Sequence, residues 1–134
     1  MRYQLLEHTA DALIKVLGST LEECFENAAY SMFDQMIDAS TVRHVEERSI
    51  EVGPDDVEEL LFGMLSELLY LHDTDGMVFS EFRVTFLDGE LRCVASGEKL
   101  DLDRHGPKTE VKAVTYHMLE VNREEPSVTV LFDI

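Results

Sequence analysis

In the second half of the chain, four short segments alternate apolar and polar side chains, and this pattern limits the possible folds more than any other part of the sequence. A period of two residues is typical of β-strands that bury one face. Between the first two segments, Asp88 and Gly89 favour a tight type I′ turn and therefore a hairpin. Strands that follow one another without regular helical segments between them favour an α+β fold over a doubly wound one. The four segments are 78–86, 91–95, 108–117 and 127–134.

Two amphipathic helices are predicted upstream of these strands. The first begins with Ser19 as its N-cap, and Glu22, three residues later, completes a capping box. The second begins after Gly53, where Pro54 near the first helical position needs no amide donor, and it ends at residues 73–76. Apolar side chains at three- and four-residue spacing give each helix one buried face. They are Leu21, Cys24, Phe25, Ala28, Ala29, Met32, Phe33 and Met36 in the first helix, and Val57, Leu60, Leu61, Met64, Leu65, Leu68 and Leu71 in the second.

Three further strands are predicted over residues 2–8, 12–17 and 42–52. The resulting order is β-β-α-β-α-β-β-β-β. We therefore predict an α+β fold in which antiparallel or mixed β-sheet layers pack with two amphipathic helices, as a single domain over residues 1–134. A chain of this length can bury a substantial hydrophobic core. Residues 97–107 are predicted to form a polar loop of the length that often carries function.

The charge of the chain limits its partners. It has 28 acidic residues against 11 lysines and arginines, a formal net charge of −17. Binding to nucleic acid is driven by basic patches that release counterions, so independent RNA or DNA binding is not expected. The same charge disfavours anionic membranes. A cation or a basic protein partner suits this electrostatic field.

Other features of the sequence predict a cytoplasmic protein. No apolar run approaches the roughly 20 residues that span a bilayer, and the N-terminus lacks the pattern of a signal peptide. Cys24 and Cys93 both lie in apolar-patterned segments. We therefore interpret them as buried free thiols in a reducing compartment, rather than as the two halves of a disulfide.

One segment begins like a calcium-binding loop. Asp101, Asp103 and Gly106 occupy the first, third and sixth positions of such a loop. However, His105 stands where an oxygen ligand belongs, and the twelfth position is Lys112, which cannot supply a bidentate carboxylate. These departures argue against a calcium loop at this place.

The end of the sequence is a second candidate for metal binding. The side chain of Asp133 and the α-carboxylate of Ile134 lie within one residue of each other, at the end of a predicted strand. Carboxylate oxygens suit calcium or magnesium rather than zinc. One pair cannot fill the coordination shell of such an ion, so a third acid and waters are needed. Asp11, in the break just after the first predicted strand, is a candidate. The alternative is an ordinary exposed terminus.

The sequence contains no recognisable catalytic signature. The five histidines lack the spacing of a zinc site, and His8 and His117 each end a predicted strand, where a histidine most often has a structural role. There is no phosphate-binding P-loop, no dinucleotide-binding glycine pattern and no G-x-S-x-G nucleophile pattern. Chemistry alone therefore does not indicate an enzyme.

Segments distributed over nearly the whole chain resemble the archease family. Each segment would be weak alone, but they occur together and in order. They are Glu7–Asp11, Thr20–Ala29, Leu68–Asp73, Val78–Phe82, Gly97–Glu98, Asp103–His105, Lys108–His117 and Phe132–Ile134.

The resemblance implies a non-catalytic accessory protein of the RNA-splicing ligase that joins tRNA exon halves and repairs RNA. Archeases promote guanylylation of the catalytic histidine of that ligase, so that the ligase turns over many times. The resemblance also implies a bound divalent cation, usually calcium, with magnesium or manganese possible. Its ligands correspond here to Asp11, Asp133 and Ile134. His8, Lys112 and His117 are then candidates for contacts with the ligase or with phosphate.

Two alternatives remain open from the sequence. The first is a stand-alone metal-dependent phosphoesterase that uses the same acids, which would require an activated water and a base. The second is a general chaperone that holds unfolded proteins. Hydrolysis by the purified protein would support the first, and suppressed aggregation of unrelated proteins would support the second.

Overall fold

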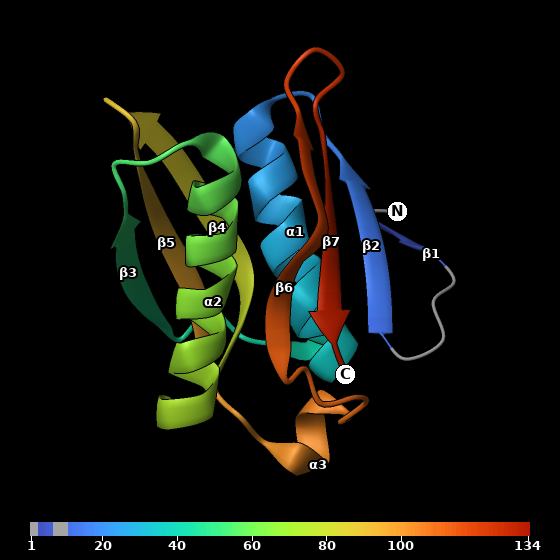
Figure 1. Ribbon diagram of the computed structural model, residues 1–134. Coiled ribbons are helices and arrows are strands. Elements are labelled where there is room, and N and C mark those ends of the chain that lie inside the picture. Colours follow the sequence, from blue (N-terminus) through green and yellow to red (C-terminus); the bar gives the residue numbers. More distant parts are fainter. Residues whose placement is uncertain (1–2, 7–10) are drawn as a thin grey trace.

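A computed structural model describes residues 3–6 and 11–134 of this protein (Figure 1). The order of its strands and long helices is the predicted one, and the α+β class is confirmed. The elements are β1 (Tyr3–Leu6), β2 (Asp11–Leu17), α1 (Leu21–Met36), the 3-10 turn η1 (Ala39–Thr41), β3 (Glu46–Val52), α2 (Val57–Asp75), β4 (Met77–Leu87), β5 (Glu90–Lys99), α3 (Leu102–His105), β6 (Ala113–Asn122) and β7 (Ser127–Asp133).

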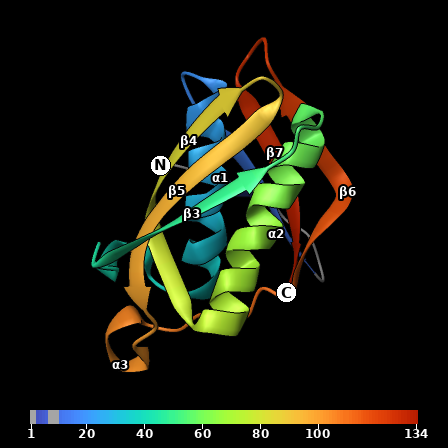
Figure 2. The ribbon, with the colours of Figure 1, turned by 90° about the vertical axis from the view of Figure 1, so that its left-hand side faces the viewer.

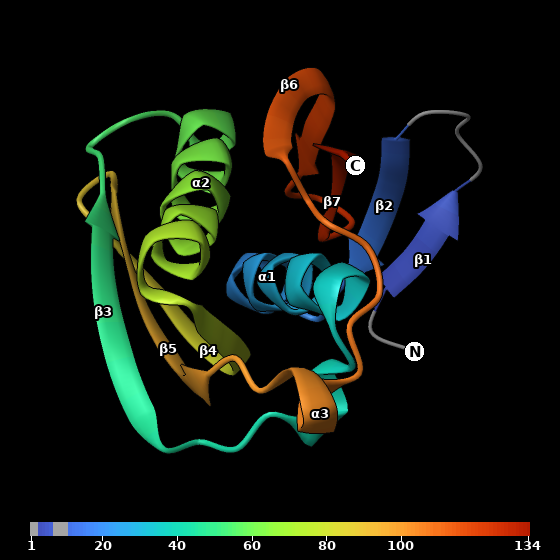
Figure 3. The same cartoon turned by 90° about the horizontal axis from the view of Figure 1, so that it is seen from below.

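The strands form two antiparallel sheets with α1 between them. One sheet has the order β1-β2-β7-β6, and the other has the order β3-β5-β4, with β5 in the middle (Figure 2). Helix α1 packs against β4 on one side and against β2 and β7 on the other (Figure 3). Helix α2 contacts β6 of the first sheet as well as all three strands of the second. The two sheets therefore share one hydrophobic core.

The aromatic residues of α1 show how that core is built. Phe25 meets Phe86 edge to face, with ring centroids 5.1 Å apart, and Phe33 meets Phe79 in the same way at 5.5 Å. Phe25, Phe33 and Phe79 are fully buried. Burying a side chain of this kind stabilises a fold by about 1.5–3 kcal/mol. The apolar stripe predicted from the sequence is thus the centre of the core.

Both helices begin slightly later than predicted. Thr20 rather than Ser19 is the N-cap of α1, because the hydroxyl of Thr20 accepts from the amide of Glu23 at 3.1 Å. The carboxylate of Glu23 in turn accepts from the amide of Ser19 at 3.1 Å. Thr20 and Glu23 fit the capping-box pattern as well as Ser19 and Glu22 do, so the pattern alone could not choose. Helix α2 begins at Val57, capped by Asp56, so Pro54 precedes the helix instead of lying in its first turn.

Three further differences concern segments predicted as strand or loop. The strand predicted over 42–52 begins only at Glu46, and in the segment before it the amide of Arg43 donates to the carboxylate of Glu98 at 2.8 Å. The predicted polar loop 97–107 contains the end of β5 and the short helix α3. The strand predicted from residue 108 begins at Ala113. The amides of Lys108 and Thr109 instead donate to the last turn of α1, at 2.8 Å to Met36 O and 3.0 Å to Gln35 O, which satisfies carbonyls that a helix end leaves unpaired.

Strand β6 is interrupted by a bulge. Thr115 pairs with Leu131 and Glu120 with Thr129, so residues 116–119 form an extra loop in the ladder, in which Met118 has a φ of 62°. The ring of Tyr116 stacks on Phe62 of α2, with centroids 3.8 Å apart, and its hydroxyl donates to Glu59 at 2.9 Å. The bulge is therefore held on α2. Within the described ranges, no helix combines the length and apolar character that crossing a membrane requires.

Candidate functional site

The two aspartates singled out from the sequence lie opposite each other. Asp11 opens β2 and Asp133 closes β7, and the antiparallel register makes them direct partners. Residues directly opposite in such a pair have Cβ atoms about 4.5–5.5 Å apart on the same face of the sheet. The register is held by the core, since Ala12, which pairs with Phe132, and Ile14, which pairs with Val130, are buried together with their partners. A slip of one residue would turn the side chains of one strand to the opposite face of the sheet and separate these buried pairs.

Strand β6 completes this edge of the sheet from the other side of β7. Ala113 pairs with Asp133, and the amide of Lys112 donates to the backbone oxygen of Asp133 at 2.7 Å. The last residue, Ile134, is half-buried and packs against the core. Asp133 is therefore held between two neighbouring strands, and Ile134 is held by its packing. Lys112 lies next to Asp133, and its side chain is exposed.

The carboxylates of Asp11 and Asp133 suit a hard cation, but they do not by themselves complete a binding site. Aspartate oxygens are ligands that calcium and magnesium accept, and six or more oxygens are typical for calcium. Among residues 3–6 and 11–134, no three His, Cys, Asp or Glu side chains gather in a way that could hold a metal ion. A cation held by Asp11 and Asp133 would need other oxygens, such as the α-carboxylate of Ile134 and water.

The structure separates the other predicted contact residues. Lys112 lies beside Asp133, as described. His117 does not end a strand as predicted, but lies exposed in the bulge of β6. Thr115 pairs with Leu131, two residues before Asp133, and His117 lies two residues further along β6. The strand therefore carries His117 away from the acid pair. His8 falls outside the described residues.

Glu98, Arg104 and His105 form a largely buried polar cluster that the sequence patterns do not predict. Arg104 donates to one carboxylate oxygen of Glu98 at 2.6 Å, and the other oxygen is 2.9 Å from Nε2 of His105, which is fully buried. The hydrogen bond from Arg104 is the largest of the causes that lower the pKa of Glu98 to about 2. Because Nδ1 of His105 accepts from the amide of Asp101 at 2.9 Å, Nε2 is the nitrogen that donates to Glu98.

This cluster joins segments rather than presenting reactive groups. Arg104 also donates to the backbone oxygen of Thr41 at 2.9 Å, and the oxygen of His105 accepts from the amide of Asp38 at 2.8 Å. The carboxylate of Asp101 accepts from the amide of Asp103 at 3.0 Å and so caps α3. Asp101, the first acid of the segment that resembled a calcium loop, therefore has a local structural role. Glu98 and His105 belong to segments named in the resemblance, but spacing gave no sign that they meet.

The two cysteines match their prediction. Cys24 and Cys93 are both buried and both free. Burial raises the pKa of Cys24 to about 11 and that of Cys93 to about 12. Both thiols are therefore protonated near neutral pH and are not nucleophiles there.

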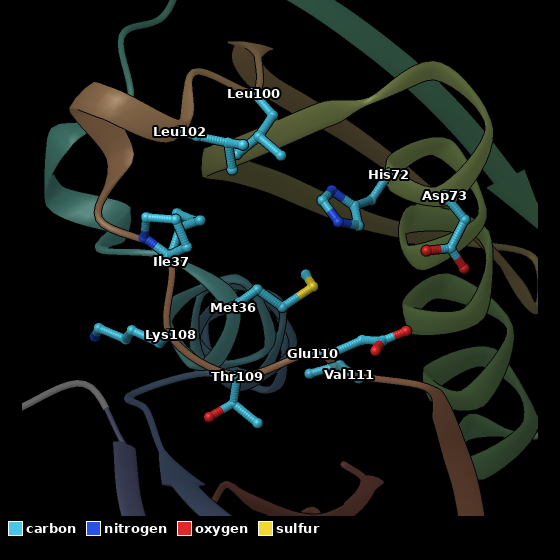
Figure 4. A pocket seen from close by; sticks show the side chains of 11 residues that line it. Met36, Ile37, His72, Asp73, Leu100, Leu102, Lys108, Thr109, Glu110 and Val111 are labelled. Carbon is cyan, nitrogen blue, oxygen red and sulfur yellow. The ribbon is translucent and has the colours of Figure 1, made fainter.

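A pocket of about 340 Å³ lies at the end of the molecule where α1 and α2 finish (Figure 4). Helix ends, the segment after β5 and the segment before β6 all contribute to it. Its floor is apolar and its margin carries two exposed acids. The lining residues are Met36, Ile37, His72, Asp73, Leu100, Leu102, Pro107, Lys108, Thr109, Glu110 and Val111.

Comparison with known proteins gives consistent results over nearly the full length. Residues 3–134 match the model of the Archease protein family (MTH1598/TM1083). Protein archease of Thermococcus gammatolerans is 45% identical over 126 residues, which cover 91% of this chain and 89% of that protein. Protein archease of Methanopyrus kandleri is 44% identical over 129 residues, covering 93% and 92%. The solution structure of Methanobacterium thermoautotrophicum protein 1598 has a TM-score of 0.85 and 38% identity, covering 99% of each chain.

Proposed function

This chain belongs to the archease family, and we propose on that premise that it is a non-catalytic accessory protein of the tRNA-splicing RNA ligase. It promotes transfer of GMP from GTP to the catalytic histidine of the ligase in the cytoplasm, which lets the ligase join tRNA exons or repair RNA repeatedly. The register that sets Asp11 opposite Asp133 is the observation that carries this proposal, because it brings acids from distant parts of the sequence together at one end of the sheet.

The acid pair is proposed to bind a divalent cation, with calcium first and magnesium or manganese as alternatives. Asp11, Asp133 and the carboxylate of Ile134 are the proposed ligands. When bound, the cation supplies positive charge that can attract a phosphate or a carboxylate of the ligase. Lys112, beside Asp133, adds a positive side chain at the same edge, whereas His117 is too far along β6 to join it directly.

Electrostatics supports a protein partner that handles RNA. A net charge of −17 is complementary to the basic surface by which a ligase binds RNA, and such complementarity accelerates association. The same charge repels RNA itself, so this protein acts on the ligase and not on its substrate. We therefore expect stimulation to weaken as salt concentration rises.

The decisive experiment is a time course of ligase guanylylation at excess GTP, with and without this protein. We expect faster formation of the ligase–GMP adduct and many turnovers of RNA joining. Asp11→Asn and Asp133→Asn should abolish the stimulation, whereas Asp88→Asn, in the exposed β4–β5 turn, should retain it. Absence of any stimulation by the unaltered protein would refute the proposal.

The same preparations distinguish the two other functions. Phosphoester hydrolysis by the protein and a cation alone, lost in Asp133→Asn, would favour the phosphoesterase. Suppressed aggregation of unrelated proteins without any effect on the ligase would favour the chaperone.

A further inference from the structure

A pocket lies between the ends of the two long helices and includes the segment that leads into β6, the strand whose first residue pairs with Asp133. Met36, Ile37 and Val111 form its floor and are only 6%, 2% and 2% exposed. In Figure 4, Met36 and His72 point into the space, with Leu100 and Leu102 above them. A volume of about 340 Å³ accommodates one large apolar side chain with part of its neighbours.

Leu102 extends this apolar surface outward. It is 63% exposed at the start of α3, and it lines both this pocket and a shallower hollow that contains Val45, itself 70% exposed. Leu100 also lines both. Single exposed leucines are common on proteins, but here two pockets share one exposed leucine as their common wall. Leu100 and Leu102 thus form an apolar ridge between the two hollows. A partner that covers this ridge removes apolar area from water, which favours association.

The charges around this ridge are one-sided. Asp73 and Glu110 are exposed at the pocket, and Asp101 and Asp103 are exposed at the neighbouring hollow. Both long helices end here, and the carboxyl end of a helix is the negative end of its dipole. This surface therefore attracts positive charge.

The cations of the same surface are occupied within the protein. Lys108 donates to the backbone oxygen of Asp34 at 3.0 Å, and Arg104 is paired with Glu98. Lys99 donates to the backbone oxygen of Asp75 at 2.6 Å. The carboxylate of Asp34, 3.6 Å from Lys108, and that of Glu98 offset the charges of Lys108 and Arg104. The four exposed acids then outnumber Lys99, whose partner is a neutral backbone oxygen.

We propose that this surface, formed by Leu100, Leu102 and the pocket beneath them, is a docking site for a basic segment of a protein partner. One apolar side chain of the segment fills the pocket, and flanking lysines or arginines meet Asp73 and Glu110. The inference rests on the proposed function, because it assigns the surface by which the ligase is held. Glu110 and Val111 lead through Lys112 to the residue opposite Asp133, so one partner can contact the docking site and the acid pair together.

The test is the affinity of the purified cognate ligase for variants of this protein, measured by calorimetry. Leu102→Asp should weaken binding by about tenfold or more, as expected when an apolar anchor is lost at the centre of an interface. Leu17→Asp is the matched control, since Leu17 is 64% exposed but ends β2 opposite Ser127, at the other end of β7. It should change the affinity less than about twofold. Asp73→Lys should weaken binding mainly at low salt.

The outcomes test the docking site and the proposed function separately. If Leu102→Asp and Leu17→Asp both bind and stimulate the ligase like the unaltered protein, the docking site is refuted while the proposed function stands. If the unaltered protein neither binds nor stimulates the ligase, both are refuted. If sedimentation shows that Leu102→Asp instead breaks a dimer of this chain, the surface is a self-interface and the docking site is refuted. Circular dichroism confirms that each variant is folded.

Discussion

At the scale of single residues, the molecule uses its buried polar groups for structure. Glu98 is 11% exposed and accepts from Arg104, from the amide of Arg43 at 2.8 Å and from His105. A buried carboxylate is stable only when its oxygens are paired in this way. The result is a fixed junction between the end of β5, α3 and the segment that leads to β3.

Glu98→Gln should make the protein less stable by about 1–2 kcal/mol near neutral pH. The folded-state pKa of Glu98, about 2, lies below its ordinary value of 4.5, so the ionised form favours the folded state. This contribution is fully present above pH 4.5 and is lost as pH falls toward 2. Urea unfolding of both proteins at pH 7, 4 and 3 measures it. A difference between them that stays constant over this range would contradict the prediction.

The thiols of Cys24 and Cys93 should resist alkylation at pH 8 in the folded protein. Burial raises the pKa of both groups well above that pH, so little thiolate exists and reagents cannot reach it. Labelling followed by mass spectrometry should show both sites modified quickly in urea and slowly without it. Rapid labelling of the folded protein would mean that these segments open easily.

At the scale of elements, backbone contacts decide where strands bend and helices stop. Strand β4 shifts its register against β5 between Phe79 and Glu81, and Gly97 lies opposite this irregularity. A Cβ atom at Gly97 would overlap the backbone oxygen of Val78. Gly76, in contrast, has open space around it but a φ of +67°, which caps α2 in the left-handed region. The two glycines are needed for different reasons.

Gly97→Ala should therefore destabilise the protein more than Gly76→Ala. The first forces two backbones apart and should cost about 3 kcal/mol or more, whereas the second costs the left-handed preference of about 1 kcal/mol. Equilibrium unfolding in urea compares them directly. Equal losses would show that the β4–β5 pair adjusts more freely than its packing indicates.

At the scale of the whole molecule, charge and the proposed cation are coupled. Many acids repel one another in the folded state, and a cation bound between Asp11 and Asp133 offsets part of that repulsion. Binding to the folded state alone stabilises it, by about 2.7 kcal/mol when the cation is a hundredfold above its dissociation constant.

Calcium should consequently raise the melting temperature by several degrees at constant ionic strength, roughly as that free energy predicts for a chain of this size. Asp11→Asn and Asp133→Asn should lose this shift, whereas Asp88→Asn should keep it, because Asp88 is not a proposed ligand. Non-specific screening by calcium affects all three variants equally and cannot produce this difference. Calorimetric melting with sodium chloride as the ionic-strength control provides the measurement. A shift retained in Asp133→Asn would place the cation elsewhere.

The local elements of the fold were predictable because their signals are local. The stripe from Leu21 to Met36 fixes α1, and the alternation around Phe82 and Val84 fixes β4, since each depends on side chains a few residues apart. The segment from Lys108 to Lys112 has the alternation of a strand, but the amides of Lys108 and Thr109 bond to the end of α1 and the strand begins only at Ala113. The local pattern does not distinguish a β-strand from an extended segment whose amides bond to the end of a helix.

The class of the fold, the two helices and the burial of the thiols follow from the amino-acid sequence, as do, through the family resemblance, the acids of the proposed cation site. Three features become visible only in the folded molecule: the division of the strands into two sheets around α1, the pairing of Asp11 with Asp133, and the contacts of Glu98 with Arg104 and His105. The physical reason is that hydrophobic periodicity specifies which face of an element is buried. Which distant element covers that face depends on the packing of the whole chain.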